Sequence, residues 1–218
     1  FPRALSALIE RHESLRTIII PVAGEPRQKI LPVGQTGFSM QYHDLSGEAA
    51  ADDLVKELAA AEYRKPFGLD SGPLTRANLV KTGHQKYVFL MTMHHIISDG
   101  WSAAVLMNEL WALYDAFKQG GAHELPPLPI QYKDYAEWQN SRLSGAAMDA
   151  HRAYWSDRFA DLPLPLGLDV DYSRASYKAY SGSHILTTLD TGISAKWKAF
   201  CSQRQVSLFT GLLAVVKA

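Results

Sequence analysis

Two adjacent histidines, His94 and His95, stand at the end of an apolar run, and Asp99 and Gly100 follow shortly after them. Residues 87–93 are typical of a strand, in which neighbouring side chains point to opposite sides. We therefore expect one imidazole to face the interior and the other to face a cleft. A histidine in a cleft can act as a general base, because its unperturbed pKa is about 6.5. We expect Asp99 to orient the loop by pairing with a buried cation, and Gly100 to leave room for a turn or a substrate.

Two other interpretations of the histidines stay open. Paired histidines at the end of a strand are often structural residues that are held by hydrogen bonds. A metal site with a His-His-x-x-x-Asp ligand set is the second alternative, but adjacent strand residues diverge, so further ligands would have to come from elsewhere. No metal site is predicted.

The elements that must position these residues follow from periodicity and from turn residues. Strands are expected at 17–21, 27–31, 38–42, 74–80, 87–93 and 184–189, with 87–93 as a central strand buried on both faces. Helices are expected at 2–15, at 48–65 after an N-cap at Ser46, between Gly100 and Gly120, around 135–138 and 154–159, at 193–204 and at 208–217.

Composition excludes several classes of function. The 218 residues carry 22 Lys+Arg and 22 Asp+Glu, so no basic face for nucleic acid is expected. With 47% hydrophobic and 20% charged residues, the composition is typical of a soluble globular protein. Cys201, the single cysteine, favours a reducing, cytoplasmic setting, and no apolar run reaches the roughly 20 residues that span a bilayer. The start at Phe1 without a methionine predicts a piece of a longer polypeptide.

Residues 94–100 (HHIISDG) resemble the HHxxxDG signature of condensation domains in nonribosomal peptide synthetases, which belong to the chloramphenicol-acetyltransferase-like superfamily. Residues 11–17 (RHESLRT) resemble the family's RHExLRT motif, and residues 132–139 (YKDYAEWQ) resemble its YxDYAxWQ motif. Tyr154-Trp155 and residues 171–174 (DYSR) lie where the family has its YW and DxPRP elements, although the second departs from the pattern.

This resemblance implies an α/β fold (α+β sandwich), a chloramphenicol-acetyltransferase-like subdomain with a mixed β-sheet flanked by helices. It also implies amide-bond formation between an acyl or peptidyl thioester donor and an aminoacyl acceptor, each on the phosphopantetheine arm of a carrier protein. No cofactor is expected to bind directly. The expected partners are upstream and downstream peptidyl carrier proteins and an adjacent adenylation domain, with neither nucleic acid nor membrane.

By position, His95 matches the family's catalytic histidine, which either takes a proton from the attacking amine or mainly positions it. The structural supports of the site are then His94, Asp99, Arg16 and Gly100. Arg16 matches the arginine that pairs with the signature aspartate in relatives, and a buried Asp99 would need such a cation.

Beside the cleft, Trp101 and Ser102 are candidate channel-lining residues. Trp101 is expected to serve packing, and Ser102 is expected to cap a helix, because no Gly-x-Ser-x-Gly elbow surrounds it.

Against the family's pattern, an opening motif and a second subdomain are missing. We expect residues 1–205 to form most of the N-terminal subdomain and residues 206–218 to begin the helix into the absent C-terminal subdomain. The 218 residues alone are therefore expected to be inactive, because the reaction channel lies between the two halves. The alternatives are a noncatalytic docking domain of the same fold and a stand-alone acyltransferase that uses a soluble thioester. The signature context weakly favours L-configured donors and disfavours epimerisation and heterocyclisation domains.

Overall fold

The computed structural model describes residues 1–122, 125–161, 167, 171–172 and 185–217. The chain divides into two compact units, Phe1–Leu162 and Pro163–Ala218. The first unit contains the sheet and the histidine segment. The described part of the second unit contains α6 (Thr191–Gln203) and α7 (Leu208–Lys217).

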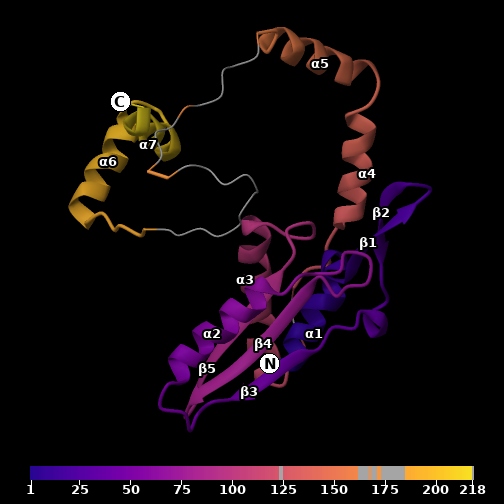
Figure 1. The fold of residues 1–218 in the computed structure, drawn as a ribbon, viewed down its shortest axis with the longest axis vertical. Coiled ribbons are helices and arrows are strands. Elements are labelled where there is room, and N and C mark those ends of the chain that lie inside the picture. The colour runs from indigo at the N-terminus through magenta and orange to yellow at the C-terminus, as the bar shows by residue number, and fades with distance from the viewer. Residues whose placement is uncertain (123–124, 162–166, 168–170, 173–184, 218) are drawn as a thin grey trace. The chain divides into compact units, whose positions relative to one another are not determined.

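A mixed three-stranded sheet organises the first unit. Its strands are β3 (Met40–Asp44), β4 (Thr75–Gly83) and β5 (Lys86–Met93), in the order β3-β4-β5 (Figure 1). β3 runs parallel to β4, and β4 and β5 form the antiparallel hairpin that the sequence predicts. The register pairs Thr75 with Met93, so the end of β5 lies beside the start of β4.

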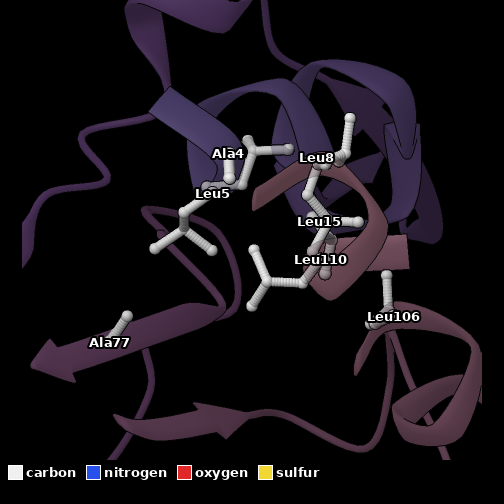
Figure 2. Packing of buried hydrophobic residues seen from close by; sticks show 9 residues of the cluster. Ala4, Leu5, Leu8, Leu15, Ala77, Leu106 and Leu110 are labelled. Carbon is white, nitrogen blue, oxygen red and sulfur yellow. The ribbon is translucent and has the colours of Figure 1, made fainter. Parts of the chain in front are cut away.

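Two helices cover one face of this sheet and form the core. They are α1 (Pro2–Arg11) and α3 (Gly100–Lys118), whose leucines recur at three- and four-residue steps. Figure 2 shows side chains from both helices and from β4 converging on one cluster. Its members are between 0% and 4% exposed: Ala4, Leu5, Leu8, Ile9, Leu15, Ala77, Leu106, Leu110 and Leu113. This packing holds α3 firmly, and the histidine segment leads directly into α3.

The opposite face of the sheet packs against α2 (Ala51–Arg64). Arg76 lies next to the core residue Ala77 on β4, so its side chain points to this second face. There its Nε donates to Glu62 Oε2 of α2 over 2.7 Å. The sheet is thus enclosed by helices on both faces, in agreement with the expected class.

The remaining elements of the first unit are a hairpin, two short 3₁₀ helices and two helices. β1 (Thr17–Val22) and β2 (Glu25–Ile30) form a separate antiparallel sheet around a turn at Ala23 and Gly24, both with positive φ. The 3₁₀ helices are η1 (Glu13–Arg16) and η2 (Val33–Gln35), and the helices are α4 (Tyr132–Arg142) and α5 (Ala146–Arg158). No helix within the described ranges is both long and apolar enough to cross a membrane.

The end of one helix and the start of another differ from the predictions. The helix expected at 2–15 ends at Arg11, and the chain tightens into η1 so that Leu15 still reaches the core. The N-cap predicted at Ser46 is wrong, because α2 begins at Ala51. Ser46 instead donates its backbone N–H to Asp44 Oδ1 over 3.0 Å, which makes a local turn after β3.

Two strand predictions are also wrong. β5 pairs only with β4 among the described strands, and its residues are exposed or half-buried. Its side chains are apolar because helices partly cover both faces of the sheet. A central strand would show the same apolar run, so periodicity cannot distinguish the two cases. Residues 185–189 belong to no helix or strand, and His184 lies outside the described residues. The described part of the second unit offers these residues no neighbouring strand to pair with.

Candidate active site

The two histidines point to different environments, as predicted for neighbouring residues of a strand. The backbone N–H of His94 donates to Leu74 O over 3.0 Å, so strand pairing continues one step past β5. The His94 ring packs edge-to-face with Phe67 at a centroid distance of 5.8 Å. His95 is exposed and lines a cavity of about 400 Å³. No described residue makes a hydrogen bond with the His95 imidazole, which leaves both ring nitrogens available to a substrate.

Three segments far apart in the sequence meet at this cavity. His12 and Ser14 come from the corner between α1 and η1, His95 comes from the loop after β5, and Tyr132 comes from the start of α4. These are the three segments that resemble family motifs. Val105 of α3 and other apolar side chains complete the wall. The cavity therefore combines an exposed imidazole with a largely apolar lining, which suits a reaction that must limit access of water.

An amide clamp fixes the start of α4 to this corner. The Gln131 side chain donates through Nε2 to Arg11 O over 2.9 Å and accepts at Oε1 from the Glu13 N–H over 3.1 Å. Lys133 Nζ also lies 2.7 Å from Glu13 Oε2. Because Gln131 and Tyr132 line the cavity, this clamp sets the position of one wall.

Asp99 and Ser102 together cap the N-terminus of α3. Asp99 Oδ1 accepts from Ser102 N over 2.8 Å and from Ser102 Oγ over 2.7 Å. In return, the Asp99 N–H donates to Ser102 Oγ over 3.2 Å, which completes a capping box. Ser102 thus takes part in a helix cap, as expected, but from position N3, and Asp99 is the N-cap residue. The hydrogen bonds from Ser102 lower the pKa of the Asp99 carboxyl from its ordinary value.

The predicted pair of Asp99 with Arg16 is wrong in this structure. Arg16 Nη1 donates to Leu31 O over 2.9 Å, and Nη2 lies 3.8 Å from Glu13 Oε1. Asp99 is exposed, so it needs no buried cation. Arg16 thus ties η1 to the end of the β1–β2 hairpin, and Asp99 supports the site through the helix cap.

Gly100 and Trp101 each differ in part from what was expected. A Cβ at Gly100 would meet no atom within 4 Å, and its φ is not in the positive range. No turn therefore requires glycine there, while the open space beside it leaves room for a substrate. Trp101 is 84% exposed and lines the cavity mouth, so the expectation that it serves packing is wrong. Its ring is available to a molecule that enters the cavity.

Replacing Asp99 by alanine should lower the unfolding midpoint by a few degrees at pH 7, because the N-cap is lost. Asp99→Asn should have little effect, since an asparagine oxygen also accepts from Ser102 N. The folded-state pKa of Asp99 is lowered, so its ionic contribution is present above the unfolded pKa of about 3.9 and is lost as the pH falls through the folded value. Thermal melts from pH 7 to pH 2.5 check this, and a large loss with Asp99→Asn at pH 7 would contradict the cap.

A second group of polar side chains, which the sequence did not predict, joins α3 to the same corner between α1 and η1. Glu109 of α3 accepts at Oε2 from Arg11 Nε over 2.9 Å, and His12 Nε2 lies 2.6 Å from the same oxygen. Burial alone would raise the pKa of Glu109, but the bonds with Arg11 and His12 outweigh it and lower the pKa. An acidic residue between Leu106 and Leu110 on an otherwise apolar stripe was the available signal.

Glu109→Gln should cost about 2 kcal/mol of unfolding free energy, because Arg11 then loses its charged partner in a site where both side chains are only 12–15% exposed. Glu57→Gln, on the exposed face of α2, is the matched control and should cost little. Urea unfolding of both variants measures the difference. Equal midpoints for the two variants would show that the Glu109 contacts do not stabilise the fold.

No group of three or more metal-ligating side chains occurs among the residues with described positions. The chemistry that the site can perform with its own groups is hydrogen bonding to, or proton transfer with, a polar atom placed against His95. The apolar walls and the exposed Trp101 ring can hold the less polar part of such a molecule.

The chain is similar in sequence to known proteins. The sequence model of one protein family, described as Condensation domain, matches residues 1–218. Malpibaldin synthetase of Mortierella alpina is 38% identical over 216 residues, which are 99% of this chain and 4% of the relative. Bacitracin synthase 2 of Bacillus licheniformis is 34% identical over 213 residues, which are 97% of this chain and 8% of that synthase. The chain thus spans a small part of the curated relatives that it matches.

Comparison with solved structures identifies the same fold. The starter condensation domain of rhizomide synthetase RzmA superposes with a TM-score of 0.68 at 23% identity, covering 74% of this chain and 38% of that chain. The first condensation domain of the calcium-dependent antibiotic synthetase, in complex with a substrate analogue, gives a TM-score of 0.65 at 26% identity, covering 76% and 39%. The fold around the cavity is therefore that of these domains.

Proposed function

Since the chain belongs to the condensation-domain family, we propose that the protein forms an amide bond between two carrier-bound substrates in nonribosomal peptide synthesis. The donor is an acyl or peptidyl thioester, and the acceptor is an aminoacyl thioester with a free amine. The observation that carries this proposal is the exposed His95 imidazole, which has no hydrogen-bond partner among the described residues and lies at a cavity where three motif segments meet.

The proposed reaction needs no reagent besides the two carrier-bound substrates. The acceptor amine attacks the donor thioester carbonyl, the C–N bond forms, the C–S bond breaks, and the amine proton ends on the departing thiol. His95 either accepts that proton or holds the amine in place through a hydrogen bond. An α-amine has a pKa near 8, so its deprotonation is not demanding, and correct placement can supply much of the rate.

The neighbouring residues support His95 in different ways. His94 anchors the loop to the sheet and Asp99 caps α3, while Gly100 leaves open space beside the helix start. Trp101 and Ser102 line the channel, which receives the phosphopantetheine arms of the carriers. No cofactor is proposed to bind the chain directly.

The proposed partners are peptidyl carrier proteins upstream and downstream and an adenylation domain beside them. Residues 1–205 are proposed as the N-terminal subdomain and residues 206–218 as the start of the helix into a second subdomain that completes the channel. The proposed setting is cytoplasmic.

Two reactions and a binding measurement distinguish this function from its alternatives. The full-length protein is given a donor-loaded carrier and an acceptor-loaded carrier, and the amide product is measured by mass spectrometry of the acceptor carrier. We expect the product to accumulate over many turnovers. Turnover with acyl-coenzyme A in place of the donor carrier would instead indicate a stand-alone acyltransferase. Carrier binding without any product would indicate a docking domain.

A further inference from the structure

We propose that Phe67 and Arg76, which lie outside the cavity, are positioning residues that hold His95 in place through His94. This inference rests on the proposed function of His95. Phe67 lies in the segment that leaves α2, and Arg76 lies on β4. Neither residue lines the cavity that His95 faces.

Hydrogen bonds from the Arg76 side chain hold the end of α2 against the sheet. Its Nη2 donates to Glu62 O and Lys65 O, both over 2.8 Å, and its Nη1 donates to Pro66 O over 3.3 Å. These acceptors are carbonyls at and just beyond the C-terminus of α2, where a cation is favourable. The guanidinium carbon also lies 3.8 Å from the centroid of the Phe67 ring. One side chain therefore fixes both the helix end and the aromatic ring that follows it.

The Phe67 ring contacts the ring of His94, the residue that directly follows β5. His94 lies on the same face of the sheet as Arg76, because Arg76 pairs with Thr92 in the register and His94 is two residues further along. The rings of Phe67 and His94 are perpendicular, with an interplanar angle of 88° at 5.8 Å. This contact restrains rotation of the His94 imidazole.

The orientation of the His94 ring in turn sets the loop that carries His95. His94 Nδ1 accepts the backbone N–H of Ile96 over 3.0 Å, so the neutral ring carries its proton on Nε2. His94 O accepts from Ile97 N over 3.1 Å and from Ser98 Oγ over 3.3 Å. His95 thus lies between His94 and Ile96, whose backbone N–H is bound by the His94 ring. If that ring rotates, the Ile96 N–H loses its partner and the backbone around His95 can shift.

The test uses Phe67→Leu in the full-length protein with both carriers loaded. We expect kcat to fall about 10-fold, because small displacements of a reacting group cost up to about 100-fold. The carrier concentration at half-maximal rate should stay within about twofold, because the cavity walls that receive the substrates do not change. Phe67→Tyr keeps the ring and should restore most of the rate.

Phe200→Leu is the matched control. Phe200 in α6 stacks on Trp197 at 5.4 Å and has the Arg204 guanidinium carbon 4.2 Å from its centroid, so it makes the same kinds of contact in the other unit. We expect its kcat to stay within about twofold of the parent. If Phe67→Leu unfolds too readily for an assay, Phe67→Met fills a similar volume without a ring and replaces it.

A double substitution separates positioning from general loss of structure. In a His94→Ala background, Phe67→Leu should cost almost no further rate, because the contact through which it acts is already gone. Rate losses that multiply, or equal losses for Phe67→Leu and Phe200→Leu, would overturn the inference. If His95→Ala itself retains the parent rate, the proposed function of His95 fails instead, so the two failures are distinguishable.

Discussion

Replacing His95 by alanine should lower the rate of amide formation by about 10²- to 10⁴-fold, the usual loss when a general acid–base group is removed. The imidazole is exposed to the cavity and makes no hydrogen bond with a described residue, so its loss should leave folding and carrier loading unchanged. Single-turnover assays with both carriers loaded measure the rate. His84→Ala, an exposed histidine in the turn at the far end of the β4–β5 hairpin, is the control and should keep the parent rate.

A second substitution at the same position distinguishes two roles of His95, which are proton transfer from the acceptor amine and placement of that amine. His95→Gln can hydrogen-bond to the amine but cannot accept a proton near neutral pH. Retention of a tenth or more of the parent rate, as a rough threshold, would favour placement of the amine, and a loss equal to that of alanine would favour a general base. A His95→Ala rate within a few fold of the parent would overturn the role of His95 altogether.

Filling the cavity with Val105→Trp should lower the rate by about 10²-fold without unfolding the protein, because a displaced substrate loses its alignment with His95. Val105 lies on α3, lines the cavity and is 40% exposed, so a larger side chain there meets open space before it meets the core. Rates and unfolding midpoints are measured together.

Ala104→Trp is the matched control for this prediction. Ala104 precedes Val105, is exposed and does not belong to the cavity lining. We expect the parent rate for Ala104→Trp. Similar rate losses at both positions would show that the effect arises from the helix surface and not from the cavity, and a parent rate for Val105→Trp would mean that the substrates bind elsewhere.

Much of the fold could be predicted because it depends on residues close together in the sequence. The hairpin of β4 and β5 follows from two apolar runs around a short polar turn, and α3 follows from leucines at helical spacing. The divergence of His94 and His95 follows from strand geometry alone. Periodicity could not show that β5 pairs with a single strand among the described residues, since helices on both faces give the same apolar pattern as burial within a sheet.

The local part of the site follows from neighbouring residues of the sequence: a strand that ends in two divergent imidazoles, followed by a capped helix. The tertiary structure selects the distant groups that meet. It gave Arg16 the Leu31 carbonyl and Glu13 as partners in place of Asp99, it joined Glu109 to His12, and it placed Phe67 against His94. This difference arises because strand alternation and helix capping act within a few residues. A long charged or aromatic side chain, in contrast, has several partners within reach, and packing selects among them.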